Sequence, residues 1–284
     1  MNDNIKKTID FDTILHRVRE TKPLIHNITN YVTVNDCANI LLACGASPIM
    51  ADDIDEVEEI TALCGGLNIN IGTLNHNSVQ SMLAAGKKAN ELGRMTVLDP
   101  VGAGASKLRT ETALRLIDEI KFDVIRGNIS EIKTLASGAG AGHTKGVDAD
   151  ISDKVTEENL KEAVAFAEQF SRKTGAVIAV TGAIDIVACG TEACCIRNGH
   201  PMMSSITGTG CQLSAMTAAF ITANRECVME AAAAAVIAMG VCGETAFDRL
   251  GRLDGNATYR NYIIDAVYRL TAEDLKRGAD YEMR

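Results

Sequence analysis

The chain has 284 residues, of which 46% are hydrophobic and 23% charged, and its formal net charge is −9. This acidic balance disfavours a sequence-independent nucleic-acid binder, which needs a basic surface to replace phosphate counterions, and it favours small molecules as partners. The apolar content is sufficient for one large domain over residues 1–284.

Targeting segments and membrane spans are not expected. Residues 1–7 lack the apolar stretch of a signal peptide. The most apolar stretch, Ala231–Val241, is too short to cross a bilayer and is bracketed by Glu230 and Glu244, which predicts a buried helix. The nine cysteines contain no C-x-x-C pair, which argues against a disulfide framework or a zinc ribbon and favours a cytoplasmic protein.

Short apolar runs alternate with longer helical patterns along the first part of the chain. This alternation predicts an α/β fold with a mostly parallel central sheet. Because ligands of such sheets bind beyond the carboxyl ends of the strands, the loops there are the expected place of the chemistry. The predicted strands are residues 24–26, 47–50, 67–71, 95–99, 122–126 and 176–181.

The pattern changes after Thr181. Residues 184–188 and 193–199 predict two antiparallel strands joined by residues 189–192, and from Cys211 onward the chain is predicted to be mostly helical. Before this region, residues 137–153 are rich in glycine and polar side chains, which predicts a mobile surface loop.

A glycine-rich turn leads into the first of these helices. In Thr207-Gly208-Thr209-Gly210-Cys211, Gly208 and Gly210 allow a tight turn, and the helix that follows presents unpaired N–H groups and the positive end of its dipole. The segment therefore predicts an anion site. It lacks the lysine of a Walker-type phosphate loop, and no complete G-x-G-x-x-G pattern supports a dinucleotide fold.

Cys211 allows two interpretations. It is either a small buried thiol chosen for its size or a reactive group beside the anion site. The helix N-terminus lowers a thiol pKa whereas a bound triphosphate raises it, so the net direction is open.

Two carboxylates can serve a magnesium ion. Asp99 ends one predicted strand, and Glu131 follows the strand that ends at Arg126. Magnesium prefers hard oxygen ligands and is often held by one or two carboxylates together with substrate phosphates. The alternative, favoured when the segment is taken alone, is that Asn128 caps a helix and Glu131 completes a capping box.

Several motifs together resemble the hydroxyethylthiazole kinase family of thiamine salvage, which belongs to the ribokinase-like superfamily. The resemblance runs nearly from end to end. Its motifs are His26-Asn27-Ile28-Thr29-Asn30, Ala46-Ser47-Pro48-Ile49-Met50-Ala51, Leu98-Asp99-Pro100-Val101-Gly102-Ala103, Arg126-Gly127-Asn128-Ile129-Ser130-Glu131, Val180-Thr181-Gly182 and Thr207-Gly208-Thr209-Gly210-Cys211.

The resemblance implies a ribokinase-like three-layer α/β/α sandwich that uses ATP to phosphorylate the hydroxyl of 4-methyl-5-(2-hydroxyethyl)thiazole, giving the thiazole phosphate and ADP. It also implies a homotrimer with active sites between subunits. The implied residues are Cys211, Gly208 and Gly210 for catalysis, Asn30, Met50 and Gly208 for the thiazole, Arg126, Thr181 and Asn128 for ATP, and Asp99 and Glu131 for Mg²⁺.

Other functions stay open on the sequence alone. A related kinase acting on hydroxymethylpyrimidine or pyridoxal would carry similar phosphate-binding residues, although Cys211 argues against it. A thiol hydrolase would use Cys211 as nucleophile with His26 or His200 as base. A noncatalytic nucleotide-binding sensor is the third alternative.

Overall fold

The computed structural model describes residues 8–138 and 154–284, so the predicted loop at 137–153 lies almost entirely outside the described residues. One nine-stranded sheet runs through the described part, in the order β2-β1-β3-β4-β5-β6-β7-β8-β9. Its strands are β1 (Leu24–Ile28), β2 (Ser47–Met50), β3 (Gly66–Asn70), β4 (Met95–Asp99), β5 (Val124–Asn128), β6 (Val177–Thr181), β7 (Asp185–Cys189), β8 (Glu192–Ile196) and β9 (Tyr281–Met283).

The sheet is parallel from β2 to β6 and antiparallel beyond it. All six predicted parallel strands and the predicted antiparallel pair are confirmed. The final strand, β9, was not predicted. It has three residues and pairs with β8 at the edge of the sheet, so it carries too little apolar alternation to stand out.

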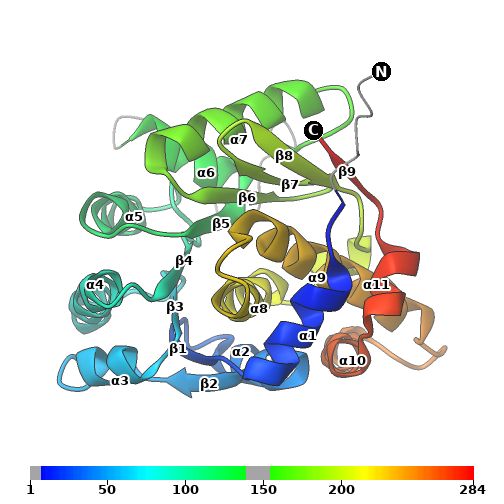
Figure 1. Cartoon of the computed structure of the whole chain (residues 1–284), viewed down its shortest axis with the longest axis horizontal. Coiled ribbons are helices and arrows are strands. Elements are labelled where there is room, and N and C mark those ends of the chain that lie inside the picture. Colours follow the sequence, from blue (N-terminus) through cyan, green and yellow to red (C-terminus); the bar gives the residue numbers. More distant parts are fainter. Residues whose placement is uncertain (1–7, 139–153) are drawn as a thin grey trace.

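Helices cover both faces of the sheet (Figure 1). Helices α3 to α7 lie on one face, and α1, α2 and α8 to α11 lie on the other. The helices are α1 (Phe11–Thr21), α2 (Val34–Cys44), α3 (Val57–Leu63), α4 (His76–Glu91), α5 (Lys107–Glu119), α6 (Ile129–Ser137), α7 (Leu160–Thr174), α8 (Thr209–Ala223), α9 (Val228–Asp248), α10 (Asn256–Arg269) and α11 (Ala272–Gly278).

The sheet separates two hydrophobic cores. Successive side chains of a strand point to opposite faces, so Val177 and Ala179 of β6 join the core under α8 and α9, whereas Ile178 and Val180 join the core under α7. Strands buried on both faces read as continuous apolar runs, which explains why the sequence pattern identified them.

Helix α9 is the one helix among the described residues that is long and apolar enough to cross a membrane. In this fold 78% of its apolar window is buried inside the molecule, because the helix packs against α8, α10 and the sheet. The predicted buried helix over Ala231–Val241 is therefore confirmed, and its alanines allow the neighbouring helices to approach closely.

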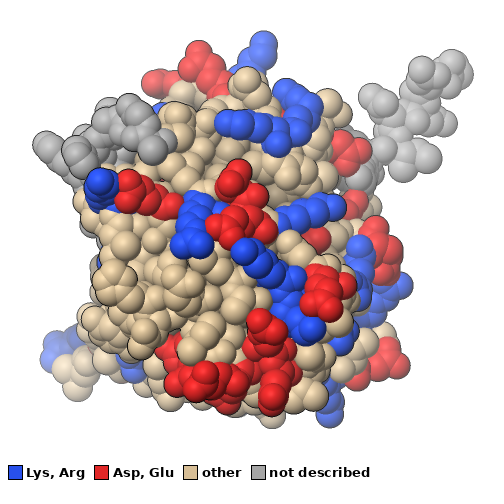
Figure 2. All heavy atoms as spheres, turned by 90° about the vertical axis from the view of Figure 1, so that its left-hand side faces the viewer, with Lys and Arg blue, Asp and Glu red and all other residues tan. Residues whose placement is uncertain are grey.

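Figure 2 shows the face of the molecule that carries α3, α4 and α5, with acidic side chains gathered at its lower edge. Lys and Arg elsewhere on this face are interspersed with Asp and Glu, so this face has no basic stripe of the kind that nucleic-acid binding requires. The exposed acidic residues in and before α3 are Asp52, Asp53, Asp55, Glu56, Glu58 and Glu59.

Candidate active site

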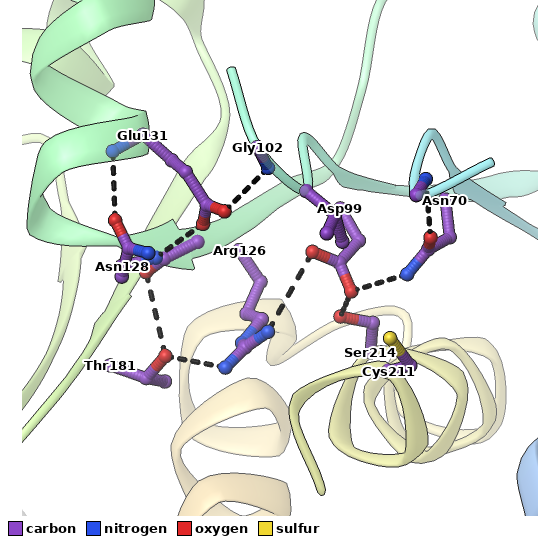
Figure 3. Close-up of polar contacts among 12 residues, drawn as sticks. Asn70, Asp99, Gly102, Arg126, Asn128, Glu131, Thr181, Cys211 and Ser214 are labelled. Atoms are coloured by element: carbon purple, nitrogen blue, oxygen red, sulfur yellow. Dashed lines mark hydrogen bonds and ion pairs between the residues drawn. The ribbon is translucent and has the colours of Figure 1, made fainter. Parts of the chain in front are cut away.

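Polar side chains meet where the parallel strands end and α8 begins (Figure 3). Asn70 ends β3 and Asp99 ends β4, and the two residues are partners in the parallel register. Asn30 follows β1, and Cys211 lies in the first turn of α8. The predicted location of the chemistry, at the carboxyl ends of the strands, is thus the place where these residues meet.

Asp99 is fully buried, and its two carboxylate oxygens have different surroundings. Oδ2 accepts hydrogen bonds from Asn70 Nδ2 at 2.7 Å and from Ser214 Oγ at 2.8 Å. Oδ1 has no hydrogen-bond partner, and Arg126 Nη1 lies 3.6 Å from it. Burial raises the pKa of Asp99, an effect that Arg126 and the two donors oppose.

Glu131 and Asn128 form a capping box at the start of α6. Asn128 Oδ1 accepts from the N–H of Glu131 at 2.9 Å, and Glu131 Oε2 accepts from the N–H of Asn128 at 2.8 Å. The capping interpretation is therefore confirmed. Glu131 Oε1 also accepts from the N–H of Gly102 at 2.8 Å, which ties α6 to the loop after β4. Burial and the nearby Asp99 charge raise the pKa of Glu131 to about 7.

Arg126 points from β5 toward both Thr181 and Asp99. Its Nη2 donates to Thr181 Oγ1 at 2.5 Å, and only 12% of its side chain is exposed. Gly210 packs directly on the guanidinium, because a Cβ added there would lie 2.5 Å from Nη1. The second glycine of the turn thus makes room for Arg126.

Gly208 serves the turn in another way. Its φ of 90° lies in the left-handed region, and a Cβ there would lie 2.6 Å from Cγ2 of Thr33. Any larger residue would disturb both the turn and the loop after β1.

Cys211 is half-buried, and Asn30 Nδ2 donates to its Sγ at 3.2 Å. Burial is the main cause that raises the pKa of the thiol, and the charge of Asp99 adds to it. Hydrogen bonds from neighbouring side chains, Asn30 among them, oppose this rise.

The two candidate histidine bases have other partners. His26 is buried, with Nε2 2.8 Å from the carbonyl oxygen of Ala51 and Nδ1 2.9 Å from Thr61 Oγ1, and burial lowers its pKa. His200 Nδ1 accepts from the N–H of Met202, and its ring stacks on Phe247 with centroids 3.6 Å apart. These contacts give no support to a thiol-histidine pair.

Met50 stands apart from the polar cluster. It ends β2, is half-buried and pairs in register with Asn27, so β1 separates it from Asn70. Sequence reasoning missed Asn70, Ser214 and the backbone of Gly102. Their roles depend on contacts across the sheet and with α8, which no local pattern encodes; the one usable signal was the place of Asn70 at a strand end.

Comparisons with known proteins point to one family. The model of the hydroxyethylthiazole kinase family matches residues 15–273. A hydroxyethylthiazole kinase from Clostridium acetobutylicum is 66% identical over 268 residues, which cover 94% of this chain and 97% of that protein. The structure of a hydroxyethylthiazole kinase protein from Pyrococcus horikoshii OT3 superposes with a TM-score of 0.85 at 35% identity, covering 96% of this chain and 98% of that one.

More distant structures share the fold alone. A ribokinase-like superfamily protein from Enterococcus faecalis V583 superposes with a TM-score of 0.59 at 12% identity and covers 87% of this chain and 86% of that one. The predicted ribokinase-like α/β fold, with a mostly parallel central sheet between helical layers, is confirmed.

Proposed function

Because the chain belongs to the hydroxyethylthiazole kinase family, we propose that it transfers the γ-phosphoryl group of ATP to the hydroxyl of 4-methyl-5-(2-hydroxyethyl)thiazole. The products are the thiazole phosphate and ADP, and the reaction belongs to thiamine salvage. The observation that carries the proposal is the meeting of Cys211, Asp99 and Arg126 at the start of α8, with Glu131 near enough for the charge of Asp99 to raise its pKa. One domain over residues 1–284 performs the reaction, since a single sheet runs through its described part.

The acceptor alcohol lies at the first turn of α8. Asn30, Met50 and Gly208 hold the thiazole, and the backbone N–H groups of the turn, at Gly208 and Gly210, stabilise charge on the transferring phosphoryl group. The thiolate form of Cys211 takes the hydroxyl proton and becomes the neutral thiol as the alcohol oxygen bonds to the phosphorus. Burial and the charge of Asp99 raise the pKa of this thiol and so disfavour the thiolate, which makes this base an assisting group rather than the dominant one.

ATP binds on the side of β5 and β6. Arg126 and Thr181 contact its phosphates, and Asn128 belongs to the same site, where it begins α6 and fixes Glu131. Arg126 carries a planar guanidinium that can donate to phosphate oxygens, which suits it to stabilise a phosphoryl group in transfer.

The carboxylates suit a magnesium ion. Oδ1 of Asp99 is a buried acceptor without a hydrogen-bond donor, and the charge of Asp99 raises the pKa of Glu131, which places the two carboxyl groups near each other. No group of three or more His, Cys, Asp or Glu suited to a metal occurs in residues 8–138 and 154–284, so magnesium would be completed by ATP phosphates and water, as it prefers. When bound, magnesium offsets the negative charge of the phosphates during transfer.

We further propose a cytoplasmic homotrimer with active sites between subunits. Exposed Tyr31, Val32 and Ile54 lie in the loops after β1 and β2, close in sequence to Asn30 and Met50, and they offer an apolar surface for a neighbouring subunit. All nine cysteines are free, which suits a reducing compartment. Light scattering at micromolar concentration checks the trimer, and a monomeric species with full activity would contradict it.

The test of the activity is ADP production with ATP and magnesium on thiazole, hydroxymethylpyrimidine and pyridoxal alcohols. The expected result is turnover on the thiazole alcohol that depends on magnesium. Faster turnover on a pyrimidine or pyridoxal alcohol would assign the chain a different substrate. ATP binding without turnover on any alcohol would support the nucleotide sensor instead.

A further inference from the structure

Asn70 forms hydrogen bonds that lead to both Asp99 and Cys211. Its side chain is 1% exposed at the end of β3 and contacts Asp99 (Figure 3). It also contacts Asn30, which donates to Cys211. We propose that Asn70 is a positioning residue that orients Asp99 and, through Asn30, the sulfur of Cys211. This inference rests on the roles proposed above for Asp99 and Cys211.

The orientation of the Asn70 amide is fixed by a group that can only donate. The backbone N–H of Gly72 donates to Asn70 Oδ1 at 2.9 Å, so the oxygen must lie on that side. Nδ2 then faces Asp99 and donates to its Oδ2 at 2.7 Å. Together with Ser214 it occupies Oδ2 and leaves Oδ1 of Asp99 facing Arg126, whose Nη1 lies 3.6 Å away.

The Asn30 amide is fixed in the same way. Its Oδ1 accepts from the N–H of Thr33 at 3.1 Å and from the Thr33 hydroxyl at 3.0 Å, so its nitrogen points away from them. That nitrogen donates to Asn70 Oδ1 at 3.0 Å and to Cys211 Sγ at 3.2 Å. With one amide hydrogen held by Asn70, the other is aimed at the sulfur.

The donors and acceptors of these hydrogen bonds are therefore fixed. Asn30 Nδ2 donates to Asn70 Oδ1 and to Cys211 Sγ, and Asn70 Nδ2 donates to Asp99 Oδ2. The sulfur of Cys211 is an acceptor in this set of hydrogen bonds, which suits a group that gains a proton during the reaction. Since a carboxylate and a base must both be held near their productive positions for phosphoryl transfer, losing the shared support affects catalysis more than nucleotide binding.

Asn68 provides a matched control. It lies two residues earlier on the same strand and is 0% exposed, and its Nδ2 donates to Asn27 Oδ1 at 3.1 Å. Removing its amide takes a buried group of the same size from the same face of β3 without touching Asp99 or Asn30.

The first experiment measures kcat and KM of Asn70→Ala, Asn70→Asp and Asn68→Ala, with thermal unfolding of each. We expect Asn70→Ala to lower kcat about 10- to 100-fold, the range that a hydrogen bond to a charged group is worth, with KM for ATP nearly unchanged. Asn70→Asp keeps the volume and the acceptor but places a second carboxylate beside Asp99, and it should lose kcat as well. Asn68→Ala should retain kcat within about 3-fold.

A fully active Asn70→Asp enzyme would overturn the proposal, because it would show that Asn70 only fills space. Equal losses of kcat in Asn70→Ala and Asn68→Ala, in step with their losses of stability, would overturn it too.

A double-mutant cycle tests whether Asn70 acts through Cys211. We expect Asn70→Ala to cost clearly less in a Cys211→Ala background than in the wild type, because part of its effect is then already lost. If Cys211→Ala lowers kcat and the losses of kcat multiply fully in the double variant, the positioning role of Asn70 is rejected and the base role of Cys211 is not. Cys211→Ala with unchanged kcat would instead reject the proposed base.

Discussion

Asn128 and Glu131 cap each other: each side chain accepts a hydrogen bond from the other residue's backbone N–H, at 2.9 and 2.8 Å. The cap is more than a helix start, because the same carboxylate also accepts from Gly102 and carries a pKa raised to about 7. A local folding motif therefore holds a candidate magnesium carboxylate in place.

Asn128→Ala should lower both stability and activity. Loss of an N-cap costs about 0.5–2 kcal/mol of the free energy of unfolding. Because Glu131 also loses the residue that orients it, we expect the magnesium concentration for half-maximal activity to rise. Chemical denaturation and a magnesium titration of the initial rate measure the two effects.

Thr271→Ala is the control for this variant. Thr271 forms a capping box with Asp274 at the start of α11, so its loss should cost a similar free energy of unfolding and leave the magnesium dependence unchanged. An equal shift of the magnesium dependence in both variants would show that the effect follows from stability alone.

Gly210→Ala should weaken ATP use. Alanine favours a helical position over glycine by about 1 kcal/mol, but its Cβ would lie 2.5 Å from Arg126 Nη1. The long arginine side chain should move away, losing its bond to Thr181. We expect KM for ATP to rise about 10-fold or more, as measured by initial rates. The melting temperature reports the gain in helix propensity minus the loss of the Arg126 contact with buried Asp99.

Gly255→Ala is the matched control, since nothing lies within 4 Å of a Cβ at that position. Its kinetic constants should match those of the wild type. A Gly210→Ala enzyme with an unchanged KM for ATP would contradict the proposed phosphate contact of Arg126.

Cys211→Asp should stay active, because a carboxylate is ionised at pH 7 and can take the hydroxyl proton. Cys211→Ala should lose no more than about 10²- to 10⁴-fold in kcat, the range typical of general-base help. The Asp99→Ala and Glu131→Ala double variant should lose much more. Single-turnover rates with saturating ATP make the comparison, and a folded Cys211→Ala enzyme that binds ATP but never turns over would indicate obligatory thiol chemistry.

His26 should make stability depend on pH in a defined direction. Burial holds its pKa in the folded protein below the ordinary value of 6.5. As the pH falls through 6.5, the unfolded chain binds a proton at His26 that the folded chain does not, so the free energy of unfolding decreases. At higher pH both states are neutral there, and this loss disappears.

The measurement is urea unfolding of the wild type and His26→Gln between pH 5 and 7.5. The difference in free energy of unfolding between the two should grow as the pH rises toward 7, because only the wild type recovers the lost stability. Parallel pH curves would show that His26 titrates alike in the folded and unfolded chains. Glu131, with its raised pKa, changes stability in the opposite direction but does so in both proteins.

The fold could be predicted where burial leaves a local pattern. The strands ending at Asp99 and Thr181 are apolar on both faces, so their composition alone identified them. The edge strand Tyr281–Met283 is short and only partly buried, and tertiary pairing with β8 determines it.

The site was predictable to a different degree. The glycine turn and the capping box depend on residues close together in the sequence, so both could be predicted from the sequence. Asn70 acts on Asp99 and Asn30, which lie 29 and 40 residues away, because the sheet places β3 between β1 and β4. The pKa direction at Cys211 likewise depends on burial and on Asp99, which a sequence does not contain.

Helix α8 is buried on all sides over its central turns, and its first two turns carry Gly210, Cys211 and Ser214. These residues contact Arg126, Asn30 and Asp99, respectively. A displacement of α8 as a rigid body would therefore shift all three contacts together. Redesign for a new acceptor should therefore begin at the exposed side chains of Tyr31, Val32 and Ile54, which take no part in these three contacts.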